Sequence, residues 1–145
     1  MKNDTALPAR VLLVDDNQFG ISARKLILEA AGYSVETALS GEEAWEIFQK
    51  IQFDVVVTDY RMGGMNGVDL IALMRKSGST ARIVLLSGFA GCLGLTEENS
   101  GADEVLVKSN TEAQELLRSV RKHAQPQRKG AASYRARKQA EQAGA

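Results

Sequence analysis

The sequence has a single cysteine and no long apolar run. Cys92 has no second cysteine to pair with, which agrees with a reducing compartment. No apolar run approaches the roughly 18–20 residues that cross a bilayer, so we expect no membrane association. The first ten residues, MKNDTALPAR, contain no apolar stretch resembling a signal peptide. These absences predict a cytoplasmic protein.

The charges are unevenly divided along the chain, although the formal net charge is zero. Residues 1–120 carry 11 basic and 17 acidic groups, whereas residues 121–145 carry 7 basic groups and one acid, Glu141. A chain of 145 residues suits one compact domain with a short appendage. We therefore expect a domain over residues 8–123 and a basic tail, flexible or marginally helical, over residues 124–145.

Five short apolar runs alternate with amphipathic patterns of helical period. Three of the runs are nearly continuous aliphatic blocks, which is typical of parallel strands buried on both faces, whereas the second run alternates and is expected nearer an edge. The runs cover residues 10–14, 33–38, 53–58, 82–86 and 103–107. The alternation predicts a doubly wound α/β fold, (βα)5, with a five-stranded parallel sheet in the flavodoxin-like order 2-1-3-4-5.

Helices are expected between these strands. A capping box formed by Ser40 and Glu43 opens the second helix, and two further helices are expected over residues 68–76 and 110–123. Residues 90–102 give the weakest helical pattern because glycines crowd them. The first helix is predicted to have one apolar face, made of Phe19, Ala23, Leu26, Ile27 and Ala30.

Polar side chains follow four of the five predicted strands. Asp15 and Asp16 follow the first, Asp59 the third, Ser87 the fourth and Lys108 the fifth. Each has another explanation when taken alone: an acidic pair can cap a helix, Ser-Gly is a common turn, and most lysines are solvated. Because the carboxyl ends of parallel strands meet at one edge, where such sheets bind ligands, their convergence predicts a functional site.

The chemistry of this group points to a metal and a phosphoryl group. Clustered carboxylates raise one another's pKa unless a cation lies among them. Oxygen ligands without histidine or cysteine select a hard ion, and a small site completed by water suits Mg²⁺. A metal beside an ammonium and a hydroxyl can neutralise a phosphoryl group, and one of the carboxylates could be the nucleophile that forms an aspartyl phosphate.

Four segments, VLLVDDN, VVVTDYRMGGMNG, IVLLSG and GADEVLVKS, resemble in order and spacing the receiver domain of two-component response regulators, over residues 8–123. The resemblance implies that Asp59 accepts a phosphoryl group from a sensor histidine kinase or a phosphotransfer protein. It also implies a signalling module rather than an enzyme, whose only catalysis is its own Mg²⁺-dependent phosphorylation and later dephosphorylation at Asp59.

The resemblance further implies a role for each matching residue. Mg²⁺ would be bound by Asp15, Asp16, Asp59 and the backbone carbonyl of Arg61. The phosphoryl oxygens would be contacted by the Ser87 hydroxyl and the Lys108 ammonium.

The chain departs from the family at several positions. Val105 stands where many members carry a tyrosine or phenylalanine that rotates inward on activation, so two alternatives are open: signalling by another route, or a receiver that only passes on or drains phosphate. Ser109 stands where proline usually follows the site lysine, which favours a trans peptide. Arg61 and Phe89 occupy positions that modulate phosphoryl lifetime in the family, although a solvated Arg61 is an equally good interpretation.

Several functions remain open on the sequence alone. The leading one is a single-domain receiver that signals through contacts with a downstream protein, with a homodimer as an open alternative. The others are a phosphate sink, an atypical receiver whose basic tail contacts nucleic acid without specific readout, and a receiver fragment of a larger regulator.

Overall fold

Five parallel strands form the centre of the computed structural model, which describes residues 7–88, 94–109 and 111–124. Their order across the sheet is β2-β1-β3-β4-β5, which confirms the predicted flavodoxin-like order and places the alternating second strand at an edge. The strands are β1 (Arg10–Val14), β2 (Ser34–Ala38), β3 (Val55–Asp59), β4 (Arg82–Ser87) and β5 (Glu104–Val107).

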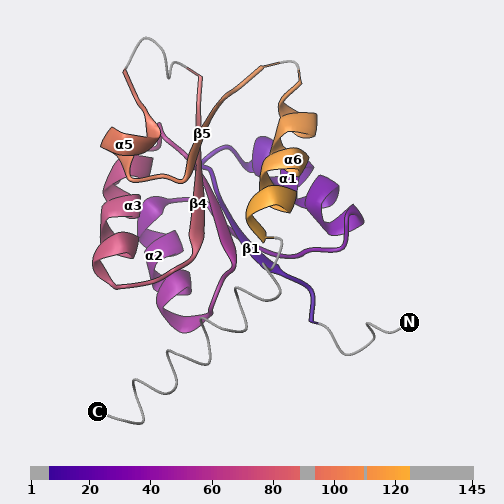
Figure 1. Ribbon diagram of the computed structural model, residues 1–145, viewed down its shortest axis with the longest axis horizontal. Helices are drawn as coiled ribbons and strands as arrows, with labels where there is room; N and C mark the ends of the chain where they lie inside the picture. The colour runs from indigo at the N-terminus through magenta and orange to yellow at the C-terminus, as the bar shows by residue number, and fades with distance from the viewer. Residues whose placement is uncertain (1–6, 89–93, 110, 125–145) are drawn as a thin grey trace.

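Helices cover both faces of the sheet (Figure 1). On one face lie α1 (Gln18–Ala30) and α6 (Glu112–Ala124), and on the other lie α2 (Gly41–Lys50), α3 (Gly67–Lys76) and α5 (Glu97–Ser100). The short α5 lies within residues 90–102, the segment whose helical pattern in the sequence was the weakest. None of the helices in the described ranges is long and apolar enough to span a membrane. The basic tail was predicted over residues 124–145. Ala124 is the last residue of α6, and residues 125–145 lie outside the described residues.

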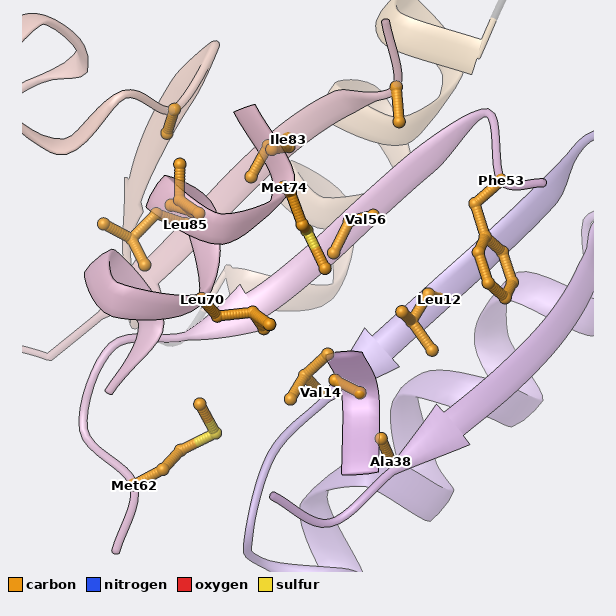
Figure 2. Packing of buried hydrophobic residues seen from close by; sticks show 14 residues of the cluster. Leu12, Val14, Ala38, Phe53, Val56, Met62, Leu70, Met74, Ile83 and Leu85 are labelled. Carbon is orange, nitrogen blue, oxygen red and sulfur yellow. The ribbon is translucent and has the colours of Figure 1, made fainter. Parts of the chain in front are cut away.

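Two apolar layers, one on each face, hold the sheet rigid. Successive residues of β3 alternate between them: Val55 and Val57 pack on the side of α1 and α6, and Val56 packs on the side of α2 and α3. Figure 2 shows the second layer, in which Leu70 and Met74 of α3 lie over the sheet. Each fully buried side chain of this size stabilises the fold by about 1.5–3 kcal/mol, so the strand ends that carry the polar residues are firmly fixed.

The apolar face predicted for the first helix is wrong. Phe19 is 89% exposed and Leu26 is 69% exposed, and the two alanines of that stripe are exposed as well. The face that packs on the sheet instead carries Ile21 and Leu28, which are buried, with Arg24 between them. Spacings of three and four residues put these three side chains on one side of the helix. An arginine therefore lies on the inner face of α1, and an apolar stripe faces solvent.

The helix starts follow ordinary capping rules with one difference from prediction. The Asn17 side chain accepts a hydrogen bond from the Gly20 N–H at the start of α1. The Ser40 hydroxyl accepts one from the Glu43 N–H at 3.0 Å, as predicted. The Glu43 carboxylate, however, accepts its backbone hydrogen bond from Leu39 at 2.8 Å rather than from Ser40, so the predicted capping box is only half formed.

Candidate functional site

An open pocket of about 400 Å³ lies at the carboxyl edge of the sheet. The structure brings all five polar residues predicted at the strand ends together in its lining, and it adds Arg61 from the loop after β3. The lining residues at the strand ends are Asp15, Asp16, Asp59, Ser87 and Lys108.

Backbone hydrogen bonds between neighbouring strands fix where these side chains begin. The Asp15 N–H donates to the Ala38 carbonyl at 3.1 Å, and the Lys108 N–H donates to the Ser87 carbonyl at 3.1 Å. The Tyr60 N–H, next to Asp59, donates to the Leu86 carbonyl at 2.8 Å. The sheet ladder therefore continues to the edge of the pocket, and the functional side chains begin from rigid backbone.

Three carboxylates lie close together at the floor of the pocket. One oxygen from each of Asp15, Asp16 and Asp59 lies within 4.8 Å of the others, and this set could hold a metal ion. Asp15 and Asp59 are buried, whereas Asp16 is exposed and accepts a long hydrogen bond, 3.4 Å, from the Gly63 N–H. The group thus combines two buried carboxylates with one that is open to solvent.

Lys108 is the direct partner of Asp59. Its Nζ forms an ion pair with Asp59 Oδ1 at 2.6 Å, and that buried oxygen has no hydrogen-bond partner among the described residues. Burial raises the pKa of Asp59 to about 6; Lys108 opposes the rise, and the neighbouring charge of Asp15 adds to it. Asp59 is therefore mostly ionised at neutral pH, and its carboxylate has oxygens able to accept more contacts.

The loop after Asp59 approaches the sheet edge closely at Gly67. A Cβ on Gly67 would lie 2.4 Å from the Asp59 carbonyl oxygen, which no side chain tolerates. The Gly67 N–H donates to the Tyr60 carbonyl at 2.8 Å and closes the loop. This glycine is therefore required for α3 to begin beside the end of β3.

The family model of the response regulator receiver domain matches residues 11–121, which is most of the chain. The chain belongs to the response regulator receiver family.

A relative supports this membership. The alginate biosynthesis transcriptional regulatory protein AlgB of Pseudomonas aeruginosa is 33% identical over 109 residues, which cover 74% of this chain and 24% of AlgB. The chain thus spans about a quarter of the length of that relative.

Solved structures agree with the fold. The chemotaxis response regulator CheY4 of Vibrio cholerae superposes with a TM-score of 0.71 at 33% identity, covering 79% of this chain and 98% of that one. The response regulator TrrA of Thermotoga maritima, in complex with Mg²⁺ and BeF, gives a TM-score of 0.66 at 34% identity over 79% and 97% of the two chains.

Sequence reasoning missed one residue that lines the pocket of this receiver domain, together with the carboxylate that pairs with it. Arg24 of α1 lines the pocket and forms an ion pair with Asp15, and its Nε donates to Glu112 of α6 at 2.7 Å. Burial would lower the pKa of Arg24, but its hydrogen bonds to both carboxylates outweigh burial and raise it. The signal in the sequence was an arginine three residues after Ile21 and four before Leu28, hidden because the wrong face of the helix was chosen as apolar.

Val105 and Ser109, which depart from the family, both lie within the described residues. Val105 is half-buried against the core on the α5 side, and its N–H donates to the Glu97 carboxylate at 2.9 Å. The peptide between Lys108 and Ser109 is trans, as predicted. Phe89, expected to modulate the site, lies outside the described residues.

Proposed function

We propose that this receiver domain accepts a phosphoryl group on Asp59 from a phosphohistidine of a sensor histidine kinase or phosphotransfer protein. The observation that carries the proposal is the environment of Asp59: a buried carboxylate, ionised at neutral pH, at the floor of an open pocket with an ammonium 2.6 Å away. A carboxylate in that state is a competent nucleophile, and the ammonium beside it can neutralise incoming negative charge.

The transfer exchanges one bond for another. An Asp59 carboxylate oxygen attacks the phosphorus of the donor, and an O–P bond forms while the P–N bond to the donor histidine breaks. The electron pair of that bond returns to the imidazole nitrogen, which takes a proton from water. Lys108 pairs with a phosphoryl oxygen as the charge of Asp59 is spread, and the Ser87 hydroxyl, buried at the end of β4, donates to another.

Mg²⁺ is the proposed cofactor, held by Asp15, Asp16, Asp59 and the backbone carbonyl of Arg61. When bound, the ion supplies charge neutralisation at the phosphoryl oxygens. The donor set fits a hard divalent cation, because every side chain in it offers only oxygen and the buried Asp59 Oδ1 has no partner but Lys108 among the described residues. The family relative TrrA was solved with Mg²⁺ and BeF, which supports the choice of ion.

The exposed stripe of α1 is the proposed contact for the phosphohistidine donor. Phe19 and Leu26 are the most exposed large apolar side chains on any described helix. The stripe begins directly beside Gly20, which lines the pocket, so a partner that covers it also covers the mouth above Asp59. A donor helix with its own apolar face fits this surface and would bring its histidine to the pocket.

The output of the domain is proposed to run through contacts with a downstream protein, in the cytoplasm. Phosphorylation adds a charge of about −1.5 to −2, which is enough to shift a two-state loop. The half-buried valine at position 105 supports a route that does not use an aromatic switch. Autophosphorylation and hydrolysis at Asp59 are the only catalysis proposed. A phosphate sink would use the same chemistry without the downstream contact.

Labelling with a small phosphodonor tests the proposal. Wild-type protein is incubated with radiolabelled acetyl phosphate, with MgCl₂ or with EDTA, and acid-stable and base-labile label is counted. The expected result is Mg²⁺-dependent label that is lost in Asp59→Asn. Asp54→Asn is the matched control, because Asp54 directly precedes the first residue of β3, at the end of the strand away from the pocket. This variant should keep its label. Absence of label on the wild type, or equal label on Asp59→Asn, would overturn the proposal.

A further inference from the structure

The guanidinium of Arg24 connects three elements at the edge of the pocket. Nη1 contacts Asp15 Oδ2 after β1, and Nε donates to Glu112 Oε2 at 2.7 Å in the first turn of α6. The side chains of Arg24 and Asp15 are 11% and 3% exposed, so both charges are largely removed from water. A buried arginine of this kind is retained only with good partners, and here it has two.

The helix geometry of α1 delivers the guanidinium to Asp15. Side chains on a helix point back toward its N-terminus, so Arg24 extends along the turn that precedes it. Gly20, four residues earlier, leaves that path open: a Cβ there would lie 3.4 Å from Asp15 Oδ2 and 3.8 Å from Arg24 Nη1. A longer side chain at position 20 would fill the space that the guanidinium uses.

Asp15 has both carboxylate oxygens engaged. Oδ1 accepts the Asn17 N–H at 2.9 Å, and Oδ2 accepts Arg24. Asp59, in contrast, has a buried Oδ1 whose only partner among the described residues is Lys108. A divalent cation that enters the acidic group therefore meets an existing positive charge at Asp15, and it must share that carboxylate with Arg24 or displace it.

We infer that Arg24 is a built-in competitor of the divalent cation for Asp15, and that Glu112 holds the guanidinium once the cation has taken that carboxylate. The inference rests on the metal site of the proposed function. Because Glu112 already accepts from Nε, Arg24 keeps one carboxylate partner when it loses Asp15 and is never left buried and unpaired. Cation binding thereby releases a link between α1 and β1 while keeping the link between α1 and α6.

The charge arrangement predicts opposite effects for the two partners of the guanidinium. Without Arg24, the cation has Asp15 to itself and binds more tightly. Without the Glu112 charge, the guanidinium loses its alternative partner, remains on Asp15 and opposes the cation more strongly. The loss of the Glu112 charge weakens cation binding only through the guanidinium of Arg24, so this effect must vanish when Arg24 is absent.

Isothermal titration calorimetry with MgCl₂ at constant ionic strength tests the inference. We expect Arg24→Met to bind Mg²⁺ about tenfold more tightly than the wild type, the size of one charge-assisted hydrogen bond. Glu112→Gln should bind several-fold more weakly, about threefold or more, and the double variant should match Arg24→Met. Lys25→Met removes a neighbouring positive charge on the same helix and should change the affinity less than about twofold.

Three results would overturn the inference: unchanged or weaker Mg²⁺ binding by Arg24→Met, an equal gain in Lys25→Met, or a Glu112→Gln effect that persists without Arg24. Arg24→Gln, whose amide can still hydrogen-bond to both carboxylates, is expected to change the affinity in the same direction and substitutes if the methionine variant does not fold. Failure of the proposed metal site gives a distinct result, because then neither the wild type nor any variant binds Mg²⁺.

Discussion

Lys108 Nζ lies 2.6 Å from Asp59 Oδ1, so the residue after β5 neutralises the carboxylate that ends β3. The two strands are not neighbours: β4 lies between them, and Lys108 reaches across its end. Asp59 is buried, whereas Lys108 is half-buried. Of the charges around Asp59, Lys108 is the strongest that keeps its pKa from rising further.

Replacing Lys108 with methionine is expected to shift the pH dependence of phosphoryl uptake toward alkaline pH. Burial and the negative charge of Asp15 both raise the pKa of Asp59, and the Lys108 ammonium lowers it. Without the ammonium, the pKa of Asp59 therefore rises above its present value of about 6. Initial rates of acetyl phosphate labelling between pH 5 and about 9 measure the shift. Lys122→Met, an exposed lysine of α6, is the control. A lower rate with an unmoved profile would mean that Lys108 acts only on the phosphoryl group.

Replacing Asp59 with asparagine is expected to stabilise the metal-free fold at neutral pH. The pKa of Asp59 is raised from 3.8 to about 6, so the native state binds a proton that the unfolded chain releases, and stability falls as pH rises from about 4 to 6. The asparagine variant escapes this loss and should be about 1–2 kcal/mol more stable at pH 7.5, with the difference shrinking toward pH 4.

Urea unfolding in EDTA at several pH values measures this difference. Glu36→Gln, on the exposed side of β2, should show no comparable pH-dependent gain. If Asp59→Asn is less stable than the wild type at pH 7.5, the ionised carboxylate is stabilised by its surroundings rather than destabilised.

The position of the site could be predicted from the sequence because strand ends are local features. Asp15 and Asp59 directly follow or complete aliphatic runs that only a buried strand accommodates, and Lys108 follows the last such run. Parallel pairing then brings the three to one edge whatever the details of packing. The strand order, predicted from the alternation of strands and helices, and the edge position of β2, predicted from its alternating pattern, both agree with the structure.

The inner face of α1 could not be predicted, because the helix has two stripes with helical spacing. The stripe that contains Phe19 and Leu26 has more apolar residues, because it also includes alanines, whereas the other stripe is interrupted by Arg24. Periodicity alone therefore favours the first stripe as the buried face. The choice depends on partners far along the chain: Glu112 lies 88 residues from Arg24. Only the folded structure shows that two carboxylates, Asp15 and Glu112, pair with Arg24 and compensate the cost of burying its charge.

Gly67, the first residue of α3, is expected to tolerate no side chain, in contrast to Gly63 in the loop before that helix. A Cβ on Gly67 would lie 2.4 Å from the Asp59 carbonyl oxygen, so Gly67→Ala must push the start of α3 away and should cost about 2–4 kcal/mol. Gly63 has open space around its Cβ position and no positive φ, so Gly63→Ala should change stability by less than about 0.5 kcal/mol. Urea denaturation of both variants checks this, and equal effects would contradict it.

Glu104 is expected to contribute to acid stability. Burial would raise its pKa, but hydrogen bonds from Arg118, Ser119 and His123 outweigh burial and lower the pKa to about 2. The stabilisation is present above the ordinary value of 4.5 and is lost as pH falls toward 2. Because the group is partly solvated, Glu104→Gln should cost only about 0.5–1 kcal/mol at pH 7 and less below pH 4. Thermal unfolding against pH measures this, with the exposed Glu46→Gln as control.

The exposed stripe of α1 is expected to affect phosphoryl transfer from a protein donor and not from a small one. Phe19→Ser and Leu26→Ser remove apolar area that a partner would bury, so transfer from a phosphohistidine kinase that labels the wild type should slow about tenfold or more. Labelling by acetyl phosphate should not change, because neither side chain lines the pocket.

Leu7→Ser is the matched control, since Leu7 is as exposed as Phe19 but precedes β1 at the opposite end of the sheet. It should leave both reactions unchanged. If both donors slow together in Phe19→Ser, the substitution has disturbed the adjacent Gly20 and Asp15 rather than a docking surface. If neither slows, the donor approaches Asp59 over another part of the pocket rim, and the apolar stripe of α1 serves a different contact.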